Sequence, residues 1–132
     1  MKSRDLLILS VLLPALMLPA CAAKKTVVTV VPEDGPKGVR IEASSFSFVP
    51  TVIRAHQGDR LVLRVVNGAG IAHNLTVKNP RGEPAARVDL PAGATVEIPL
   101  ELTEAGSWPY YCDKTFHETL GMSGRIEAAP RR

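Results

Sequence analysis

Three residues near the end of the chain carry side chains that bind soft metal ions. Cys112, His117 and Met122 follow the spacing Cys-x4-His-x4-Met and supply a thiolate, an imidazole and a thioether within one short loop. Thiolate and thioether ligands select copper, whereas Mg²⁺ or Ca²⁺ would require carboxylate and carbonyl oxygens. One further histidine would complete a site of two histidines, one cysteine and a weak axial methionine. The loop therefore predicts a copper site.

Short strands must position this loop. Apolar and polar residues alternate in segments 39–45, 60–67 and 94–102, and no apolar stripe repeats every 3.6 residues. Turn-forming residues separate these segments, which is typical of an antiparallel β-sandwich. Pro99 cannot donate a hydrogen bond to a neighbouring strand, so we expect its strand to lie at a sheet edge or to be bulged there.

The strand before the loop presents Trp108, Tyr110 and Cys112 on one face, because alternate residues of a strand point the same way. Upstream, two glycines precede His73 and Asn74, which begin another strand-like run.

Taken in the order His73, Cys112, His117 and Met122, the chain resembles the cupredoxins, the plastocyanin- and azurin-like blue-copper proteins. The resemblance covers roughly residues 39–128. Further matches are Phe46-x-Phe48-x-Pro50, Gly58-Asp59, His73-Asn74 and Gly106-x-Trp108-x-Tyr110-Tyr111-Cys112. It implies a Greek-key antiparallel β-sandwich of the all-β class, one type 1 copper per chain, and His73 as the missing ligand. The Cys-to-His spacing is azurin-like, the His-to-Met spacing is plastocyanin-like, and Trp108 stands where tyrosine is more common.

The roles of the ligands follow from what an electron carrier needs. Each bond that rearranges between two oxidation states adds to the barrier, so the ligand set must suit both Cu(I) and Cu(II) and be held rigidly. Cys112 would form the short covalent Cu–S bond, and His73 and His117 would complete the trigonal plane. Met122 would be the weak axial ligand, with Glu118 as the alternative, harder ligand.

Residues around the ligands have expected roles of their own. Asn74 is expected to support the ligands without binding the metal itself, because its amide can hydrogen-bond across to the Cys112 loop and fix it. Asp113 and Lys114 are expected to be solvated loop charges.

A redox partner is expected to dock near His117, because the family places this imidazole at the surface inside an apolar rim. Tyr111 faces outward from its strand and offers a second contact point. Rim candidates are Ile71, Phe116 and Leu120.

The N-terminus has the composition of an export signal. Basic residues precede an apolar run over 6–18, which is shorter than a membrane-spanning helix requires. The sequence Leu18-Pro-Ala-Cys21 resembles a bacterial lipobox, in which the cysteine is lipidated. We expect residues 1–20 to be a lipoprotein signal peptide, 21–38 a lipidated tether, and 39–132 the copper-binding domain. This predicts a periplasmic or extracytoplasmic domain anchored to a membrane, with the outer membrane favoured in a Gram-negative cell.

Two alternatives stay open at this stage. The β-branched residues 26–31 suit a flexible spacer, which we prefer, or an additional edge strand. An exported protein can also form a disulfide, here between Cys21 and Cys112, although lipidation of Cys21 would occupy its sulfur.

Electron transfer between envelope redox partners is the preferred function, with copper or iron delivery as the alternative. The latter lacks the His-rich or Met-rich tracts that would support it. An enzyme with a second copper centre needs more histidines than His56, His73 and His117, and His56 reads as a solvated turn residue. The net charge of +3 does not indicate nucleic-acid binding, and a monomer is expected.

Overall fold

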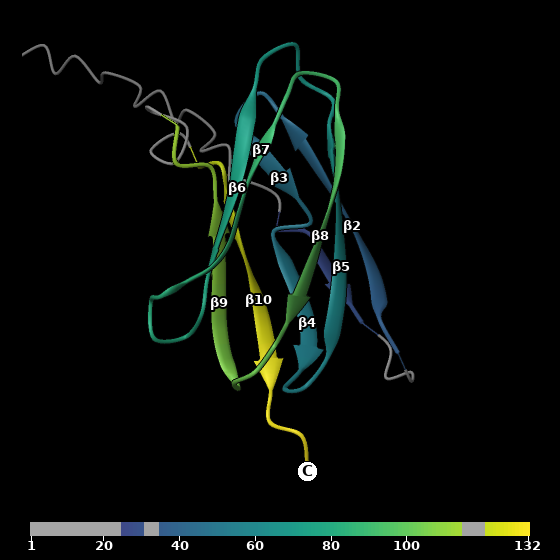
Figure 1. Ribbon diagram of the computed structural model, residues 1–132, viewed down its shortest axis with the longest axis vertical. Helices are drawn as coiled ribbons and strands as arrows, with labels where there is room; N and C mark the ends of the chain where they lie inside the picture. The colour runs from purple at the N-terminus through teal and green to yellow at the C-terminus, as the bar shows by residue number, and fades with distance from the viewer. Residues whose placement is uncertain (1–24, 31–34, 115–120) are drawn as a thin grey trace, which may run out of the picture.

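A computed structural model describes residues 25–30, 35–114 and 121–132 of the 132-residue chain. These residues form two packed β-sheets, and no helix occurs among them (Figure 1). The strands are β1 (Val27–Thr29), β2 (Lys37–Ser44), β3 (Ser47–Val49), β4 (Val52–His56), β5 (Arg60–Asn67), β6 (His73–Lys78), β7 (Pro84–Leu90), β8 (Thr95–Glu101), β9 (Gly106–Tyr111) and β10 (Ser123–Ala129). The predicted all-β sandwich is confirmed.

The two sheets contain both parallel and antiparallel pairs. The larger sheet has the order β1-β4-β10-β9-β6-β7, and the smaller has the order β3-β2-β5-β8. The pairs β1/β4, β4/β10 and β2/β5 are parallel, which corrects the expectation of antiparallel pairing throughout. Parallel neighbours cannot be joined by a tight hairpin, and here the chain passes through the other sheet between them.

The position of Pro99 agrees with its prediction. It lies in β8, which pairs with β5 alone and forms an edge of the smaller sheet. A residue without an N–H is tolerated at such an edge, because one side of the strand has no neighbour to receive a hydrogen bond.

The preferred interpretation of residues 26–31 as a spacer is wrong for Val27–Thr29. This segment is the edge strand β1, parallel to β4, with Val27 opposite Val52. Thr26 and Thr51 fasten its start: each backbone N–H donates to the other residue's hydroxyl oxygen over 3.0 Å. The strand forms because β4 offers free backbone groups on this side, and β-branched residues suit an extended conformation.

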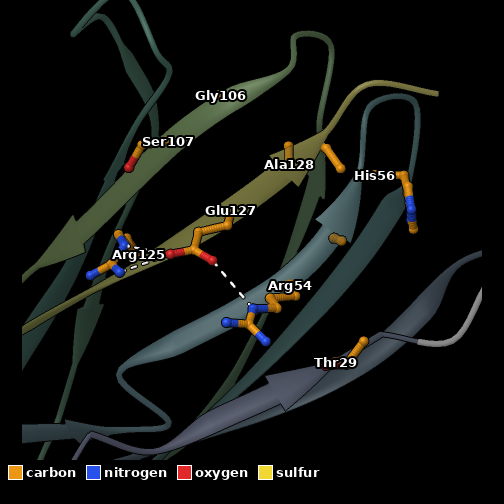
Figure 2. A pocket seen from close by; sticks show the side chains of 10 residues that line it. Thr29, Arg54, His56, Gly106, Ser107, Arg125, Glu127 and Ala128 are labelled. Atoms are coloured by element: carbon orange, nitrogen blue, oxygen red, sulfur yellow. Dashed lines mark hydrogen bonds and ion pairs between the residues drawn. The ribbon is translucent and has the colours of Figure 1, made fainter. Parts of the chain in front are cut away.

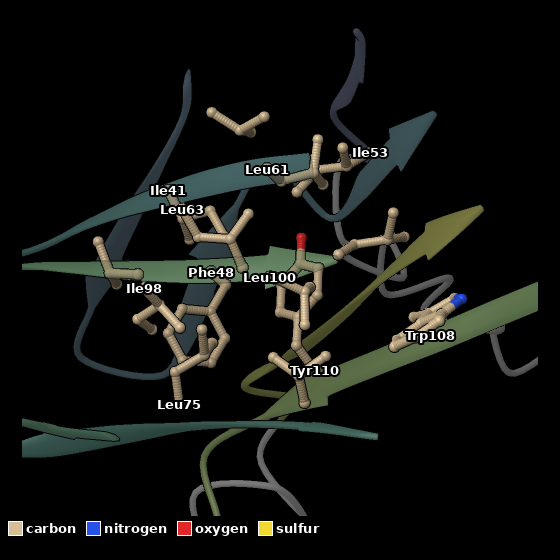
Figure 3. Close-up of a cluster of buried hydrophobic side chains, with 14 of the residues drawn as sticks. Ile41, Phe48, Ile53, Leu61, Leu63, Leu75, Ile98, Leu100, Trp108 and Tyr110 are labelled. Carbon is tan, nitrogen blue, oxygen red and sulfur yellow. The ribbon is translucent and has the colours of Figure 1, made fainter. Parts of the chain in front are cut away.

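The core lies between the sheets (Figure 3). Phe48 of the smaller sheet meets Tyr110 of the larger one edge to face, with ring centroids 5.9 Å apart. Trp108, Tyr110 and Cys112 are all buried, which confirms that they share one face. The Tyr110 hydroxyl donates to the backbone oxygen of Pro50, so the polar end of this large side chain is satisfied inside the core.

The sandwich has two poles. The site pole, at the top of Figure 1, is where β9 ends and β6 and β10 begin. The opposite pole carries the C-terminus and the β4–β5 turn. There the buried Asp59 carboxylate accepts hydrogen bonds from Lys37 at 2.7 Å and Arg131 at 2.5 Å. These bonds join β2, the turn and the C-terminal residues.

A buried asparagine joins the loops of the site pole. The Asn67 side-chain NH₂ is within 2.9–3.0 Å of the backbone oxygens of Ile71, Leu90 and Pro91. Its side-chain oxygen accepts the N–H of Ala69 over 3.0 Å. One side chain therefore connects the end of β5 with the β5–β6 loop and the end of β7.

Candidate metal centre

Three of the four predicted ligands lie together at the site pole. His73 begins β6, Cys112 follows the last residue of β9, and Met122 precedes the first residue of β10. All three are fully buried. His73 Nδ1 is 4.0 Å from Cys112 Sγ, and the Cys112 N–H donates to the Met122 backbone oxygen over 3.1 Å. Antiparallel pairing of β9 with both β6 and β10 brings these distant residues to one place.

The spacing of the two donor atoms fits a shared metal ion. With bond lengths typical of protein zinc sites, about 2.3 Å to sulfur and about 2.0 Å to nitrogen, two ligands of one ion are roughly 3.6–3.8 Å apart. The observed separation of 4.0 Å requires little movement. The donors are an imidazole and a thiol beside a thioether residue, a set that suits copper.

Asn74 contacts the loop that follows Cys112. Its side-chain oxygen accepts the Asp113 backbone N–H over 2.8 Å, and its side-chain NH₂ donates to the Asp113 carboxylate. Asn74 is fully buried and Asp113 is exposed, so this bridge between β6 and the cysteine loop lies at the boundary of the core. The bond across to the cysteine loop that the sequence suggested for this amide is therefore present.

The expectation that Asp113 is only a solvated charge is wrong. Its carboxylate also accepts hydrogen bonds from Arg87, at 3.0 and 3.2 Å, and from Thr76 at 3.2 Å. The bonds from Arg87 and then Asn74 lower the pKa of Asp113 to about 2, so the group is ionised at neutral pH. A loop charge next to Cys112 is thereby fixed to the neighbouring strands β6 and β7.

The fourth predicted ligand, His117, lies outside the described residues, as do Glu118, Phe116, Leu120 and Cys21. The proposed Cys21–Cys112 disulfide is therefore untested. Among residues 25–30, 35–114 and 121–132, no group of three or more His, Cys, Asp or Glu side chains is placed to hold a metal ion. The described part of the site thus contains one imidazole, one thiol and one thioether side chain that could bind a metal.

His56 does not belong to this site. It is the last residue of β4, rather than a turn residue, and it is half-buried at the opposite pole. There it lines a pocket on the outer face of the larger sheet together with Arg54, Arg125 and Glu127 (Figure 2). Glu127 accepts from Arg125 at 2.8 Å and from Arg54 at 3.4 Å, so its charge is already compensated.

Tyr111 occupies the outer face beside the site. Its side chain is half-buried, and the ammonium group of Lys78 lies 5.4 Å from the centre of its ring. This is the distance of a cation–π contact. The residue that precedes Cys112 is therefore near the surface and has a positive charge over its ring.

Sequence reasoning missed Asn67 and Arg87. Asn67 ends a regular alternating strand and Arg87 lies in a short segment without a motif, so neither position indicated a role. Their importance depends on which strands are neighbours. An asparagine at an inward-facing strand position was the one available signal for Asn67, because a buried amide needs partners.

Comparison with known families identifies the fold and the chemistry together. Residues 37–129 match the family of copper binding proteins described as the plastocyanin/azurin family, and the chain belongs to this family. Plastocyanin of Capsella bursa-pastoris is 32% identical over 92 residues, covering 62% of this chain and 87% of that protein.

Solved structures support the same fold. Auracyanin A, a "blue" copper protein from Chloroflexus aurantiacus, has a TM-score of 0.64 and 19% identity, covering 71% of this chain and 99% of that chain. A copper-containing nitrite reductase from Thermus scotoductus has a TM-score of 0.63 and 18% identity, covering 74% of this chain but 28% of that chain. The sandwich therefore occurs both in a small blue-copper protein and as part of an enzyme.

A search of the described residues for a helix long and apolar enough to cross a membrane finds none.

Proposed function

We propose that this chain is a membrane-tethered type 1 copper protein that carries single electrons between redox partners of the cell envelope. The observation that carries the proposal is the buried pair of His73 Nδ1 and Cys112 Sγ, 4.0 Å apart and next to buried Met122. One copper ion per chain, when bound, would cycle between Cu(I) and Cu(II). His73, Cys112, His117 and Met122 are the proposed ligands.

Strand pairing, burial and one hydrogen bond would hold the proposed ligands in place. His73 and Cys112 are at the ends of paired strands, so their separation is set by the sheet and not by a free loop. Burial excludes water from both side chains. Asn74 fixes the backbone after the cysteine, which limits movement of the thiolate when the charge of the site changes.

Electron exchange requires an accessible edge of the site. We place partner docking near His117, and exposed Ile71 on the β5–β6 loop, at 46% relative exposure, is a described candidate for the apolar rim. The signal-like N-terminus and the lipobox-like sequence support a location outside the cytoplasm, with an anchor through lipid on Cys21. We expect a monomer, since no symmetric contact is needed to complete the ligand set.

An enzymatic role has little support in the described residues. A second copper centre in the same chain would require histidines grouped away from the first site. His56 and His73 lie at opposite poles, so they do not contribute to one centre. Membership of the family by itself is compatible with metal delivery, which the following experiment separates from electron transfer.

The test is visible absorption and EPR of the soluble chain, residues 22–132, during titration with Cu(II). We expect an intense thiolate-to-copper band with a small copper hyperfine splitting, saturating at one copper per chain. Reversible reduction without loss of the metal would support electron transfer. A protein that stays colourless, or that releases copper on reduction, would contradict the proposal and favour metal delivery.

A further inference from the structure

We propose that the lipid anchor holds the site pole of the sandwich toward the membrane surface, with the lipid headgroup layer as the surface that this pole meets. The inference rests on the proposed tether at Cys21. Its structural basis is the place at which the N-terminal strand enters the larger sheet.

Strand pairing sets this place. β1 is parallel to β4, and β4 is parallel to β10, so all three strands start on the side of the site pole. Val27 is opposite Val52, which is opposite Arg125, three residues after Met122. An antiparallel edge strand would instead have received the upstream chain at the opposite pole.

Lys25 lies still closer to the site. It lines a pocket on the outer face together with Tyr111, Gly121 and Ser123. Gly121 and Ser123 flank Met122, and Tyr111 precedes Cys112. Lys25 therefore lies beside residues that adjoin two of the proposed ligands, Cys112 and Met122.

The covalent distance to the anchor is short. Four peptide units separate Cys21 from Lys25, and at full extension they span about 14 Å. The six residue steps of β10, from Ser123 to Ala129, cover about 20 Å toward the opposite pole. A lipid on Cys21 therefore keeps the Lys25 side of the domain near the headgroups, and the opposite pole is held farther away.

The surface of the site pole suits this contact. Phe46 and Ile71 are exposed, at 44% and 46%, on the β2–β3 and β5–β6 loops. The Gly68 N–H, just after β5, donates to the Ala43 oxygen near the end of β2 over 2.9 Å, so the two loops leave neighbouring strand ends. Exposed apolar residues at the same pole as a lysine are favourable at an interface that has apolar chains and anionic headgroups.

The orientation is testable without a redox partner. The mature chain, 21–132, carrying a diacylglycerol on Cys21 and diamagnetic Cu(I), is placed in nanodiscs of phosphatidylcholine and phosphatidylglycerol with a nitroxide headgroup lipid. Paramagnetic relaxation of backbone amides is then compared between the poles. We expect enhancement on the order of tenfold or more at Tyr111, Gly121 and Ser123 relative to Gly58 and Gly106, given the pole separation of about 20 Å. Equal enhancement, or greater enhancement at Gly58, would overturn the inference.

Two variants serve as controls. A flexible Gly-Ser spacer of about twelve residues inserted between Ala23 and Lys24 is expected to remove most of the difference between poles. Replacing Phe46 with serine should reduce the enhancement at the site pole but leave the copper spectrum unchanged. An unchanged enhancement in this variant would argue against headgroup contact by the β2–β3 loop.

Separate measurements test whether Cys21 is lipidated and whether the site pole faces the membrane. Mass spectrometry of protein made with its own signal sequence shows whether Cys21 is lipidated. An unmodified Cys21 would contradict the tether in the proposed function. The orientation is still measured after chemical attachment of the lipid to the same sulfur, and the copper titration reports on the site independently of both.

Discussion

The backbone N–H of Asp113 donates to the side-chain oxygen of Asn74 over 2.8 Å. The residue after Cys112 is thereby bonded to the residue after His73. Two proposed ligand positions that are far apart in sequence are thus linked by a bond that contains no metal atom, so their spacing is a property of the polypeptide.

Asn74→Ala should destabilise the chain by about 1–3 kcal/mol, because it leaves the Asp113 N–H without its buried acceptor. The measurement is urea unfolding of the metal-free protein, together with hydrogen exchange at the Asp113 amide, which should become faster. Thr76→Val is the matched control: it removes one hydrogen bond to the Asp113 carboxylate but keeps the backbone bond. Equal effects of the two variants would show that the backbone bond has no special importance.

Cys112→Ser should abolish the thiolate-to-copper absorption band, because the sulfur that produces it is gone.

Met122→Leu should keep the colour and raise the reduction potential, because a weak donor is replaced by a hydrocarbon side chain of similar volume. Spectroscopy and voltammetry of the purified variants check both results. An unchanged band in Cys112→Ser would refute the ligand assignment.

Asp59→Asn should cost about 3–5 kcal/mol at neutral pH, because it leaves Lys37 buried without its charged partner. The comparison is Glu42→Gln, which breaks the exposed pair with Arg40 and should cost less than about 1 kcal/mol. Urea unfolding at pH 7 measures both. Similar losses in the two variants would mean that burial adds little to the Lys37–Asp59 pair.

Stability should also depend on pH through Asp59. Burial alone would raise the pKa of this carboxyl, but the hydrogen bond from Lys37, the His56 N–H and the two nearby cations outweigh it and lower the pKa. A group with a lowered pKa in the folded state stabilises the fold above its unfolded pKa of about 3.9, and this contribution is lost as the pH falls through the folded value. Unfolding free energies measured from pH 6 downward should therefore decline less steeply in Asp59→Asn than in the natural chain. Parallel curves would exclude Asp59 as a source of acid sensitivity.

Gly124→Ala should destabilise the fold by roughly 1–3 kcal/mol or more, because it overpacks the core. A Cβ at this position would lie 2.4 Å from the Tyr110 ring, whose hydroxyl is held by Pro50. Gly38→Ala is the control, since a Cβ there has no neighbour within 4 Å. Thermal unfolding should show a lower midpoint for Gly124→Ala and little change for Gly38→Ala. A tolerated Gly124→Ala would mean that Tyr110 moves more freely than its hydrogen bond suggests.

Local patterns predicted those features that depend on one strand at a time. The shared face of Trp108 and Cys112 follows from alternation along β9, and the edge position of Pro99 follows from its missing N–H. Both can be read from a few consecutive residues. The all-β class follows from the same alternation repeated along the chain.

Several features that depend on which strands are neighbours were not predicted, or were weighed only as an alternative. The spacing of Asp113 and Arg87, 26 residues apart, carries no periodic signal, and their ion pair exists because β6 lies between β9 and β7. Similarly, the strand at Val27–Thr29 is stabilised by β4, whose position follows from parallel pairing with β10. Sequence periodicity does not give the order or direction of strands in a sheet.

The contacts of the Asn67 side chain with four backbone groups bear on the order of events during maturation. They join the end of β5, the β5–β6 loop and the end of β7 through protein atoms alone. This part of the scaffold therefore needs no bound ion to take its shape. The polypeptide can complete this part of its fold and pass cellular quality control first, and receive its inorganic component afterwards.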